Sequence, residues 1–351
     1  MVSRRFSFAI PGDLKTPTGG YAYDARMIAE LAQLGWQADV LDLGAEFPRP
    51  SAACRAAARA RLASVPPGRC IVIDGLALGV LPDEAAGLRA THKLVALVHH
   101  PLALETGLTA AEADVLRTSE RAALAHMSHV IVTSPATKRH LVADYGVTAG
   151  QVSVAMPGVE PMPPSRGSRD GTVALLAVGA LVPRKGYDLL VAALAEMPEL
   201  PWRLTIVGDR DRAPATAAQL DAAIAAARLN GRVTLAGAVS SEDLTAFYAS
   251  ADLFVLPSRH EGYGMAFAEA IAHGVPVIGT RAGAIPDTVP DGTGILVPPD
   301  DVAALSAALR TLIGEPDARA GLATAARAAA AKLPTWPASA RIFAQVLEAV
   351  A

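Results

Sequence analysis

The sequence predicts an α/β protein made of two doubly wound parallel sheets. Short apolar runs rich in Val, Ile and Leu alternate with longer helix-like segments over almost all of the 351 residues. Runs that are apolar throughout are typical of parallel strands that helices cover on both faces. A chain of this length also exceeds what one hydrophobic core normally covers, so we expect two domains.

In the first half of the chain, apolar runs predict strands and longer patterns between them predict helices. We expect the strands at residues 6–10, 38–43, 70–73, 94–98, 130–132 and 152–155. We expect the helices at residues 22–34, 52–63, 110–125 and 136–145. Strand–helix alternation of this kind is the βαβ pattern of a parallel sheet.

A segment with little that could enter a core, residues 161–171, follows this half. It holds three prolines and two glycines, which favours a linker between domains. The alternation then restarts, with strands expected at 173–178, 204–207, 233–235, 253–256 and 275–278. The helices expected between them are 186–196, 213–229, 242–249 and 264–273. Beyond residue 302 the pattern is helical, apart from an interruption at 333–337.

The composition excludes several classes of protein. The net charge is −3, from 31 basic and 34 acidic residues, so the chain lacks the basic excess that nucleic-acid binding needs. Hydrophobic residues make up 52% of the chain, but charges and helix breakers interrupt every long apolar stretch, which argues against a membrane span. Two cysteines are too few for a disulfide framework, and no long apolar segment opens the chain. We therefore expect a cytoplasmic protein.

The strongest motif follows the strand expected at 253–256. Glu261 and Glu269, eight positions apart, flank a Gly262-Tyr263-Gly264 turn that opens a helix. Glycines let backbone amides approach a ligand, and a helix N-terminus favours negative charge. The spacing of the two carboxylates suits two hydroxyl-rich groups at opposite ends of a diphosphate, such as a sugar and a ribose. The alternative is a buried Glu269 that neighbouring amides satisfy.

A second motif follows the strand expected at 173–178. There Gly179 is followed by Arg184 and Lys185 at the start of a helix. Cations at a helix N-terminus oppose the helix macrodipole, so this placement favours a bound anion, with phosphate as the first choice. The alternative is that both side chains extend into water.

The first domain offers a Gly19-Gly20 pair after its first strand. These glycines place backbone amides at a helix N-terminus, and Thr18 can cap that helix. Ligands of open parallel sheets bind beyond the carboxyl ends of the strands, and in two such domains these ends can face each other across one cleft. The pair is therefore expected on the opposite wall of the cleft from Glu261.

Two histidines, His99 and His100, directly follow the strand expected at 94–98. Histidine can donate a hydrogen bond or change its charge near neutral pH. Consecutive residues on extended backbone point in opposite directions, so we expect one of the two in the packing and the other at the cleft. Glu105 is expected to orient the histidine at the cleft.

Weaker signals follow three other strands. Gly208 and the segment 237–240, which includes Val239, lie where loops can hold a nucleotide base. Asp74 follows the strand expected at 70–73 and is explained equally well as an ordinary turn or helix cap.

No metal site is predicted. Asp209 and Asp211 form an Asp-x-Asp pair that could hold a divalent cation, but Arg210 between them argues against it. A pair of adjacent histidines offers only one ligand to a single site.

Together these motifs resemble family 4 of the retaining glycosyltransferases, which have the GT-B fold. The most specific part is the Glu-x7-Glu motif from Glu261 to Glu269, joined by Gly283-Ala284-Ile285-Pro286 after the next strand. The resemblance extends nearly end to end. It implies two Rossmann-like, doubly wound domains that face each other across a cleft, with a C-terminal helix crossing back.

The resemblance assigns a role to each part of the chain. Residues 1–163 would form the acceptor-binding domain, and residues 172–332 the domain that binds the nucleotide-sugar donor. Residues 333–351 would form a helix that packs back towards the N-terminal domain.

The resemblance also assigns roles to single residues. It implies that Glu261 contacts the donor sugar, Glu269 the ribose and Lys185 the diphosphate. The residues thereby expected in catalysis are His99, with His100 as the second choice, Arg184, Lys185 and Glu261. The residues expected to bind the nucleotide sugar are Gly19, Gly20, Gly179, Gly208, Val239, Gly262, Tyr263, Gly264, Met265, Ala266 and Glu269.

Three positions depart from the family pattern. Ala180 stands where an Arg is common, and we expect Arg184 to supply that charge. Asp287 replaces a Glu, and Pro157 replaces an Asn that more usually precedes the Gly-Val pair.

The implied function is transfer of a sugar from a nucleotide diphosphate sugar to a hydroxyl acceptor, with retention of the anomeric configuration. The acceptor would be a glycan, a lipid-linked molecule or a small molecule. A front-face displacement, in which the leaving phosphate takes the acceptor proton, suits the lack of a carboxylate placed for attack. We expect no cofactor and no obligatory metal. The alternatives are a nucleotide-sugar epimerase or hydrolase of the same fold, and a nucleotide-sugar-binding protein without catalysis.

A basic face is expected on the helix at 52–63. Arg55, Arg59 and Leu62 fall at helical spacing on it. The first interpretation is a solvated face, and the second is a weak peripheral contact with the inner face of the membrane.

Overall fold

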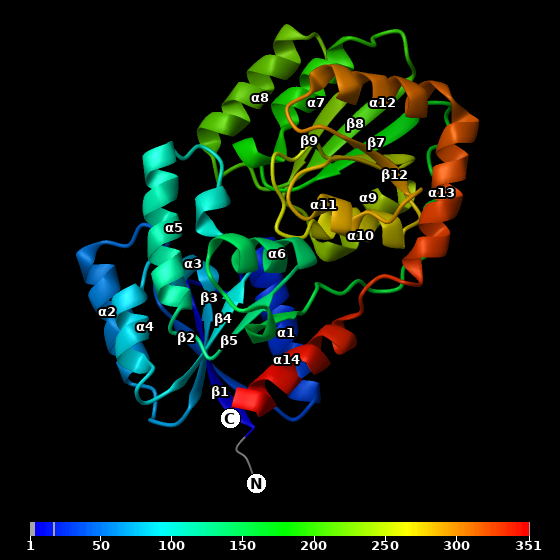
Figure 1. The fold of residues 1–351 in the computed structure, drawn as a ribbon. Helices are drawn as coiled ribbons and strands as arrows, with labels where there is room; N and C mark the ends of the chain where they lie inside the picture. The colour runs from blue at the N-terminus through cyan, green and yellow to red at the C-terminus, as the bar shows by residue number, and fades with distance from the viewer. Residues whose placement is uncertain (1–3, 17, 351) are drawn as a thin grey trace. The chain divides into compact units, whose positions relative to one another are not determined.

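The structure is a computed structural model that describes residues 4–16 and 18–350. The chain divides into two compact units (Figure 1). The first unit combines Met1–Gly158 with Pro334–Ala351, and the second is Val159–Leu333. Each unit has its own hydrophobic core, built around its own sheet.

The first unit contains a six-stranded parallel sheet with the order β2-β1-β3-β4-β5-β6. Its strands are β1 (Arg5–Ile10), β2 (Gln37–Asp42), β3 (Cys70–Asp74), β4 (Lys93–Val98), β5 (His129–Val132) and β6 (Val152–Val154). The central strands are buried along almost their whole length, as the uninterrupted apolar runs predict. All six strands expected from the sequence are present.

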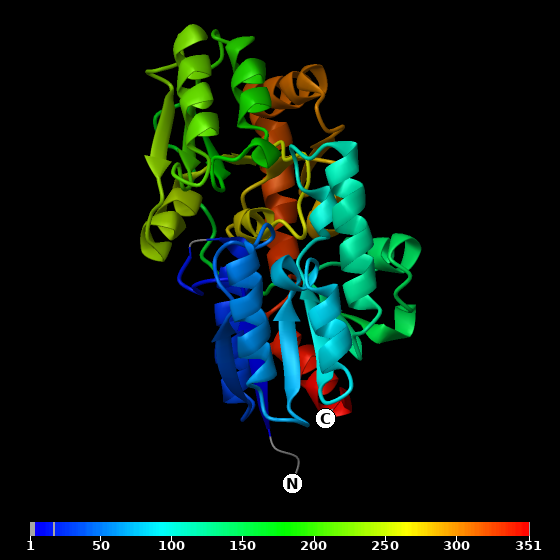
Figure 2. The ribbon, with the colours of Figure 1, turned by 90° about the vertical axis from the view of Figure 1, so that its left-hand side faces the viewer.

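Helices cover both faces of this sheet. They are α1 (Gly19–Gln33), α2 (Ala52–Ala63), α3 (Gly75–Leu78), α4 (Pro82–Leu88), α5 (Ala110–Leu124), α6 (Pro135–Asp144) and α14 (Trp336–Val350), with short 3₁₀ turns η1 (Leu102–Leu104) and η2 (Ala149–Gln151). The last helix of the chain, α14, packs against α1 and the end of the sheet (Figures 1 and 2). The sequence does not predict α3 and α4, which are too short to show helical periodicity.

The second unit contains another six-stranded parallel sheet, with the order β12-β11-β10-β7-β8-β9. Its strands are β7 (Val173–Val178), β8 (Trp202–Val207), β9 (Val233–Gly237), β10 (Leu253–Val255), β11 (Val277–Thr280) and β12 (Gly294–Val297). The sequence predicts five of them and misses β12, a four-residue edge strand.

The helices of the second unit follow its strands in turn. They are α7 (Tyr187–Ala195), α8 (Pro214–Ala226), α9 (Ser241–Ser250), α10 (Met265–Ala272), α11 (Ile285–Thr288), α12 (Val302–Gly314) and α13 (Pro316–Ala330), with a 3₁₀ turn η3 (Pro183–Lys185) before α7. The helical pattern beyond residue 302 resolves into α12 and α13, and the interruption at 333–337 precedes α14.

The boundary between the units lies slightly before the linker expected at 161–171. Residues of that segment hydrogen-bond within the second unit. The Ser165 amide donates to the carbonyl of His273 over 2.7 Å, and the Arg166 amide donates to the carbonyl of Ala249 over 2.9 Å. The proline-rich segment is therefore a packed part of the second unit.

Each sheet has a point at which the strand order reverses. In the first sheet this point lies between β1 and β3, and in the second between β7 and β10. Open α/β sheets bind ligands in the crevice beyond the carboxyl ends of such strands. The loops after these four strands are therefore where a site is expected. Along the described residues, no helix is long and apolar enough to span a bilayer.

Candidate functional site

Glu261, in the loop after β10, is the centre of an ion cluster in the second unit. Lys185 Nζ lies 2.8 Å from Glu261 Oε1, and Arg184 Nη1 lies 3.2 Å from Glu261 Oε2. The Ser258 hydroxyl also donates to Glu261 Oε1, over 2.6 Å. The motifs after β7 and β10 therefore meet at the reversal point of the sheet.

The charge state of Glu261 follows from these contacts. Burial by itself raises the pKa of Glu261, but Lys185 and Arg184 outweigh burial and, with Ser258, lower the pKa to about 2. The carboxylate is ionised at neutral pH and can only accept hydrogen bonds. Since both cations are largely buried, the alternative that they extend into water is wrong.

Two glycines allow the loops after β7 and β8 to approach this cluster. A Cβ atom on Gly179 would lie 2.8 Å from Lys185 Cε, and one on Gly208 would lie 1.8 Å from the Gly179 carbonyl oxygen. The contact at Gly208 is with backbone, which excludes a side chain there, and Gly179 has φ +153°, a conformation that side chains rarely adopt. Gly179 is thus next to the Lys185 stem, and Gly208 packs against the backbone of Gly179.

The turn between Glu261 and α10 opens a helix N-terminus. Gly264 adopts a left-handed conformation, with φ +95°, and α10 begins directly after it at Met265. The first amides of a helix have no partner within the helix, so those of Met265 and Ala266 are available to an anion. The carbonyl of Tyr263 accepts a hydrogen bond from Thr288, which holds the turn in place.

Glu269, in α10, is held by an aromatic side chain of α9. The Tyr248 hydroxyl donates to Glu269 Oε2 over 2.9 Å, and the Tyr248 ring stacks on His273 at 5.3 Å. Burial raises the pKa of Glu269, and the Tyr248 hydrogen bond partly offsets this. Glu269 is partly exposed, and its hydrogen bond comes from Tyr248 rather than from the backbone amides of the alternative interpretation.

The loops expected to hold a base follow β8 and β9. Arg210 pairs with Asp221 over 2.5 Å, and the Asp211 amide donates to Asp209 Oδ1 over 2.8 Å. Asp209 therefore shapes its own turn. Val239, after β9, is partly buried against the core of the second unit.

In the first unit, Gly19 and Gly20 are the first residues of α1 rather than a free loop. Thr18 caps this helix, as predicted, by accepting a hydrogen bond from the Tyr21 amide over 3.3 Å. Gly20 lies against the ring of His99, where a Cβ atom would come 3.5 Å from His99 Cδ2. Gly20 and His99 are thus brought together.

His99 contacts two carboxylates through one nitrogen. His99 Nε2 lies 3.2 Å from Asp24 Oδ1 and 3.3 Å from Asp74 Oδ2. The side chains of Asp24 and Asp74 are only 1% and 6% exposed, whereas that of His99 is 22% exposed. Burial by itself lowers the pKa of His99, but the two carboxylates outweigh it and raise the pKa well above its usual range.

His100 takes a different partner. Its Nε2 lies 3.5 Å from Glu105 Oε2, and its side chain is 24% exposed. The expectation that one histidine of the pair is packed away is therefore wrong, because both rings remain partly exposed. The chain bends directly after β4, so the two side chains do not point in opposite directions as they would on extended backbone.

The sequence interpretation missed Asp24 and undervalued Asp74. Asp24 lies on the buried face of α1, together with Met27 and Leu31. A carboxylate at a core-facing position of an amphipathic helix is rare unless it is paired, and this signal could have identified it. Among residues 4–16 and 18–350, Asp24, Asp74 and His99 form the one group with ligand atoms close enough for a metal ion, all within 4.8 Å of one another.

The basic face on α2 has an intramolecular partner. Arg59 pairs with Glu84 over 2.9 Å, and Arg55 lies 3.6 Å from the same carboxylate. Leu62 is buried in the core of the first unit. We expected the three side chains to share one face that contacts either water or a membrane. This is wrong for Leu62, because its side chain is buried.

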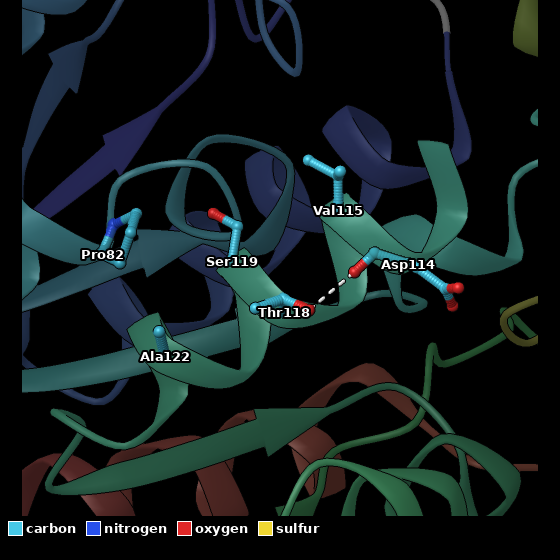
Figure 3. Close-up of a pocket in the computed structure, with 6 residues that line it drawn as sticks. All are labelled: Pro82, Asp114, Val115, Thr118, Ser119 and Ala122. Carbon is cyan, nitrogen blue, oxygen red and sulfur yellow. Dashed lines mark hydrogen bonds between the residues drawn. The ribbon is translucent and has the colours of Figure 1, made fainter. Parts of the chain in front are cut away.

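A shallow groove of about 480 Å³ lies on the surface of the first unit, along α5 (Figure 3). It is lined by Pro82, Asp114, Val115, Thr118, Ser119 and Ala122. None of these residues belongs to the motifs at the strand ends.

Comparison with known proteins relates the second unit to one family. Residues 172–315 match the family model described as "Glycosyl transferases group 1". The chain is 31% identical to D-inositol 3-phosphate glycosyltransferase of Kineococcus radiotolerans, over 71% of this chain and 65% of that protein. It is 34% identical to mannosylfructose-phosphate synthase of Agrobacterium fabrum, over 44% of this chain and 38% of that protein. The chain thus spans less than two thirds of the length of these curated relatives.

Solved structures share the fold over the whole chain. Sucrose-phosphate synthase of Thermosynechococcus elongatus matches with a TM-score of 0.83 and 22% identity, covering 99% of this chain and 98% of that one. Anabaena HepE, solved in complex with UDP and glucose, matches with a TM-score of 0.75 and 20% identity, covering 98% and 99%. These matches confirm the predicted GT-B fold.

Proposed function

Because the chain belongs to the group 1 glycosyltransferases, we propose that it transfers a sugar from a nucleoside diphosphate sugar to a hydroxyl acceptor with retention of configuration. The observation that carries this proposal is the contact of Arg184 and Lys185 with Glu261 at the reversal point of the second sheet. It combines two cations for a diphosphate with a carboxylate for sugar hydroxyls.

Lys185 and Arg184 are proposed to stabilise the leaving diphosphate. The leaving group gains negative charge as the bond to the sugar breaks, and fixed cations in a buried site stabilise such charge strongly. In this proposal the N-terminus of α10, which begins directly after Gly264, adds backbone donors for the same anion. Arg184 also takes the role of the cation missing at Ala180 in this proposal, because it is the second cation in the cluster.

Glu261 is proposed to hold the donor sugar and not to attack it. It is ionised, but two cations and the Ser258 hydroxyl already occupy its oxygens. A carboxylate held in this way is a poor nucleophile. This supports a front-face displacement, in which the acceptor oxygen bonds to the anomeric carbon as the leaving phosphate departs and takes the acceptor proton.

The remaining donor contacts are proposed as follows. Glu269, oriented by Tyr248, binds the ribose hydroxyls, and the loops containing Gly208 and Val239 border the base. His99 acts near the donor sugar. HepE is described in complex with UDP and glucose, which supports a sugar nucleotide as the donor.

The acceptor is proposed to be a small hydroxylated molecule. The names of two relatives, D-inositol 3-phosphate glycosyltransferase and mannosylfructose-phosphate synthase, describe acceptors or products of this size. A panel of polyols, sugars and their phosphates is the direct test. The reaction is proposed to take place in the cytoplasm, and vesicle flotation with anionic lipid tests whether any membrane contact exists.

The decisive assay measures nucleoside diphosphate release from UDP- and GDP-sugars with and without an acceptor, and determines the product anomer by NMR. Release that requires the acceptor, with a retained anomer, is the expected result. Release without any acceptor would identify a hydrolase, and interconversion of the donor sugar alone would identify an epimerase. Donor binding without turnover over the whole panel would identify a binding protein. Activity that survives EDTA is also expected.

A further inference from the structure

Asp24 and Asp74 approach the same ring nitrogen of His99 from two different elements. Asp24 comes from α1, and Asp74 is the last residue of β3 and caps α3. Their oxygens lie 3.2 and 3.3 Å from His99 Nε2. A single nitrogen that faces two carboxylates can serve both only as an N–H donor, so Nε2 carries a proton in this arrangement.

Both carboxylates are fixed in position. Asp74 Oδ1 accepts a hydrogen bond from the Leu76 amide over 2.8 Å, which leaves Oδ2 for His99. Asp24 is almost completely buried, and within the described residues its Oδ2 has no hydrogen-bond partner. Two buried carboxylates need a positive charge nearby, because an unpaired buried charge is strongly unfavourable. The imidazole ring of His99 can supply that charge.

The opposite edge of the ring is left for a ligand. Gly20 covers the Cδ2 edge, and the Tyr23 ring packs edge-on at 5.3 Å between centroids. These contacts cover the Nε2 and Cδ2 edge of the ring and leave the edge that carries Nδ1 for a ligand. Since both carboxylates are buried, a substrate would meet the imidazole ring and not Asp24 or Asp74.

We propose that Asp24 and Asp74 are positioning residues that hold His99 as an imidazolium, whose Nδ1–H donates a hydrogen bond to an oxygen of the sugar nucleotide. This inference rests on the proposed function. It adds the charge state of His99 and the two carboxylates that hold it. His99 is then a fixed cationic donor that stabilises negative charge. It is not a general base, because neither nitrogen has a free lone pair.

The charged surroundings of His99 support this state at neutral pH and above, because burial raises the pKa of Asp24 to about 6. The titratable groups around its ring are Asp24 on α1, Asp74 on β3, and Tyr23, whose hydroxyl donates to the carbonyl of Ala155 over 2.9 Å. Its chain neighbour His100 pairs with Glu105. The raised pKa of His99 means that its charge persists above neutral pH and is lost only as the pH rises through that raised value.

The test is an NMR titration of the full chain labelled with ¹⁵N-histidine, with His99 assigned by comparison with His99→Gln. The expected result is that both ring nitrogens of His99 remain protonated from pH 6 to 8. In the Asp24→Asn/Asp74→Asn double variant, His99 should titrate near the ordinary histidine value of about 6.5. A neutral His99 ring at pH 7 in the wild-type protein would overturn the proposal, and this outcome does not depend on whether the double variant folds.

The kinetic readout separates positioning from general structural support. The transfer rate of the double variant should fall about twentyfold between pH 6 and 8, because the imidazolium fraction falls by about that factor for a pKa near 6.5. The wild-type rate should change less than twofold. Equal losses at both pH values would indicate a merely structural role and contradict the proposal. Asp144→Asn, which removes the exposed His140–Asp144 pair on α6, is the matched control.

The same spectra decide between a proton and a metal ion. One equivalent of Zn²⁺ should leave the His99 signals of the wild-type protein unchanged. A shift to the signals of a neutral, metal-bound ring would assign Asp24, Asp74 and His99 to a cation site and overturn the proposal. A charged His99 in a protein without transferase activity would instead refute the proposed function, so the two failures are distinguishable.

Discussion

Lys185 and Glu261 are 76 residues apart in the sequence, yet their charged atoms lie 2.8 Å from each other. The contact joins the loop after β7 to the loop after β10, which are neighbouring strands in the sheet. The two most informative motifs of the sequence are therefore parts of one cluster.

Lys185→Ala should lower the transfer rate by about 10² to 10³, the usual effect of removing one group that stabilises developing charge. Binding of the free nucleoside should weaken much less, because the lysine is assigned to the diphosphate. Steady-state kinetics and nucleoside titration measure the two effects. Lys332→Ala, an exposed lysine, is the matched control. A wild-type rate in Lys185→Ala would contradict the assignment.

Glu261→Gln should destabilise the ligand-free protein by about 3 kcal/mol, because it leaves two buried cations without their carboxylate. A nucleoside diphosphate supplies negative charge to the same cations. The rise in Tm on adding UDP or GDP should therefore be larger for Glu261→Gln than for the wild type. A smaller rise in the variant would show that the diphosphate binds elsewhere.

The stabilising effect of Glu261 should depend on pH in a definite direction. The pKa of Glu261 is about 2 in the folded protein, whereas an unperturbed Glu, as in the unfolded chain, has a pKa of 4.5. A lowered pKa stabilises the folded state above pH 4.5, and this stabilisation, about 3 kcal/mol at most, is lost as the pH falls from 4.5 towards 2. The Tm difference between wild type and Glu261→Gln should thus shrink over that interval. A difference that stays constant down to pH 2.5 would refute this account.

Tyr248→Phe should raise the donor KM about two- to tenfold, since it removes one hydrogen bond that orients Glu269. The value of kcat should change less, because Glu269 is assigned to the ribose and not to the reacting bond. Glu269→Ala should have a larger effect on KM in the same direction. An effect of Tyr248→Phe on kcat alone would place Glu269 nearer to the chemistry.

Gly158→Ala should destabilise the first unit. A Cβ atom at this position would lie 2.1 Å from the Trp336 amide nitrogen, so α14 would have to move. Gly321→Ala is the matched control, because it lies in α13 with open space around it and should stabilise the helix by about 0.5 to 1 kcal/mol. Thermal unfolding should show a lower Tm for Gly158→Ala and a higher Tm for Gly321→Ala than for the wild type.

The parts of the fold that the sequence predicts are those with strong local signals. Buried strands such as β4 are uninterrupted apolar runs, and α1 has both a cap and an apolar face. The elements it misses, α3, α4, α11 and β12, have four to seven residues each. Such short segments are fixed by tertiary contacts and not by their own periodicity.

The candidate site shows the same division. Arg184, Lys185 and Glu261 could be expected together because their motifs both follow strands and suit one ligand. The contacts of Asp24 and Asp74 with His99 could not be expected from the sequence. The two aspartates are 50 residues apart, and only the sheet order brings them together. The Tyr248–Glu269 contact was not predicted either, because no sequence pattern links α9 with α10.

The return of α14 to the first unit makes the second unit an insertion within the first. Gly158 and Trp336, on either side of that insertion, are in direct contact. Excising Val159–Leu333 would therefore leave two chain ends already adjacent, ready to be rejoined by a short peptide. The second unit is one continuous segment of the chain, Val159–Leu333, whereas the first unit is made of two segments, one on either side of it.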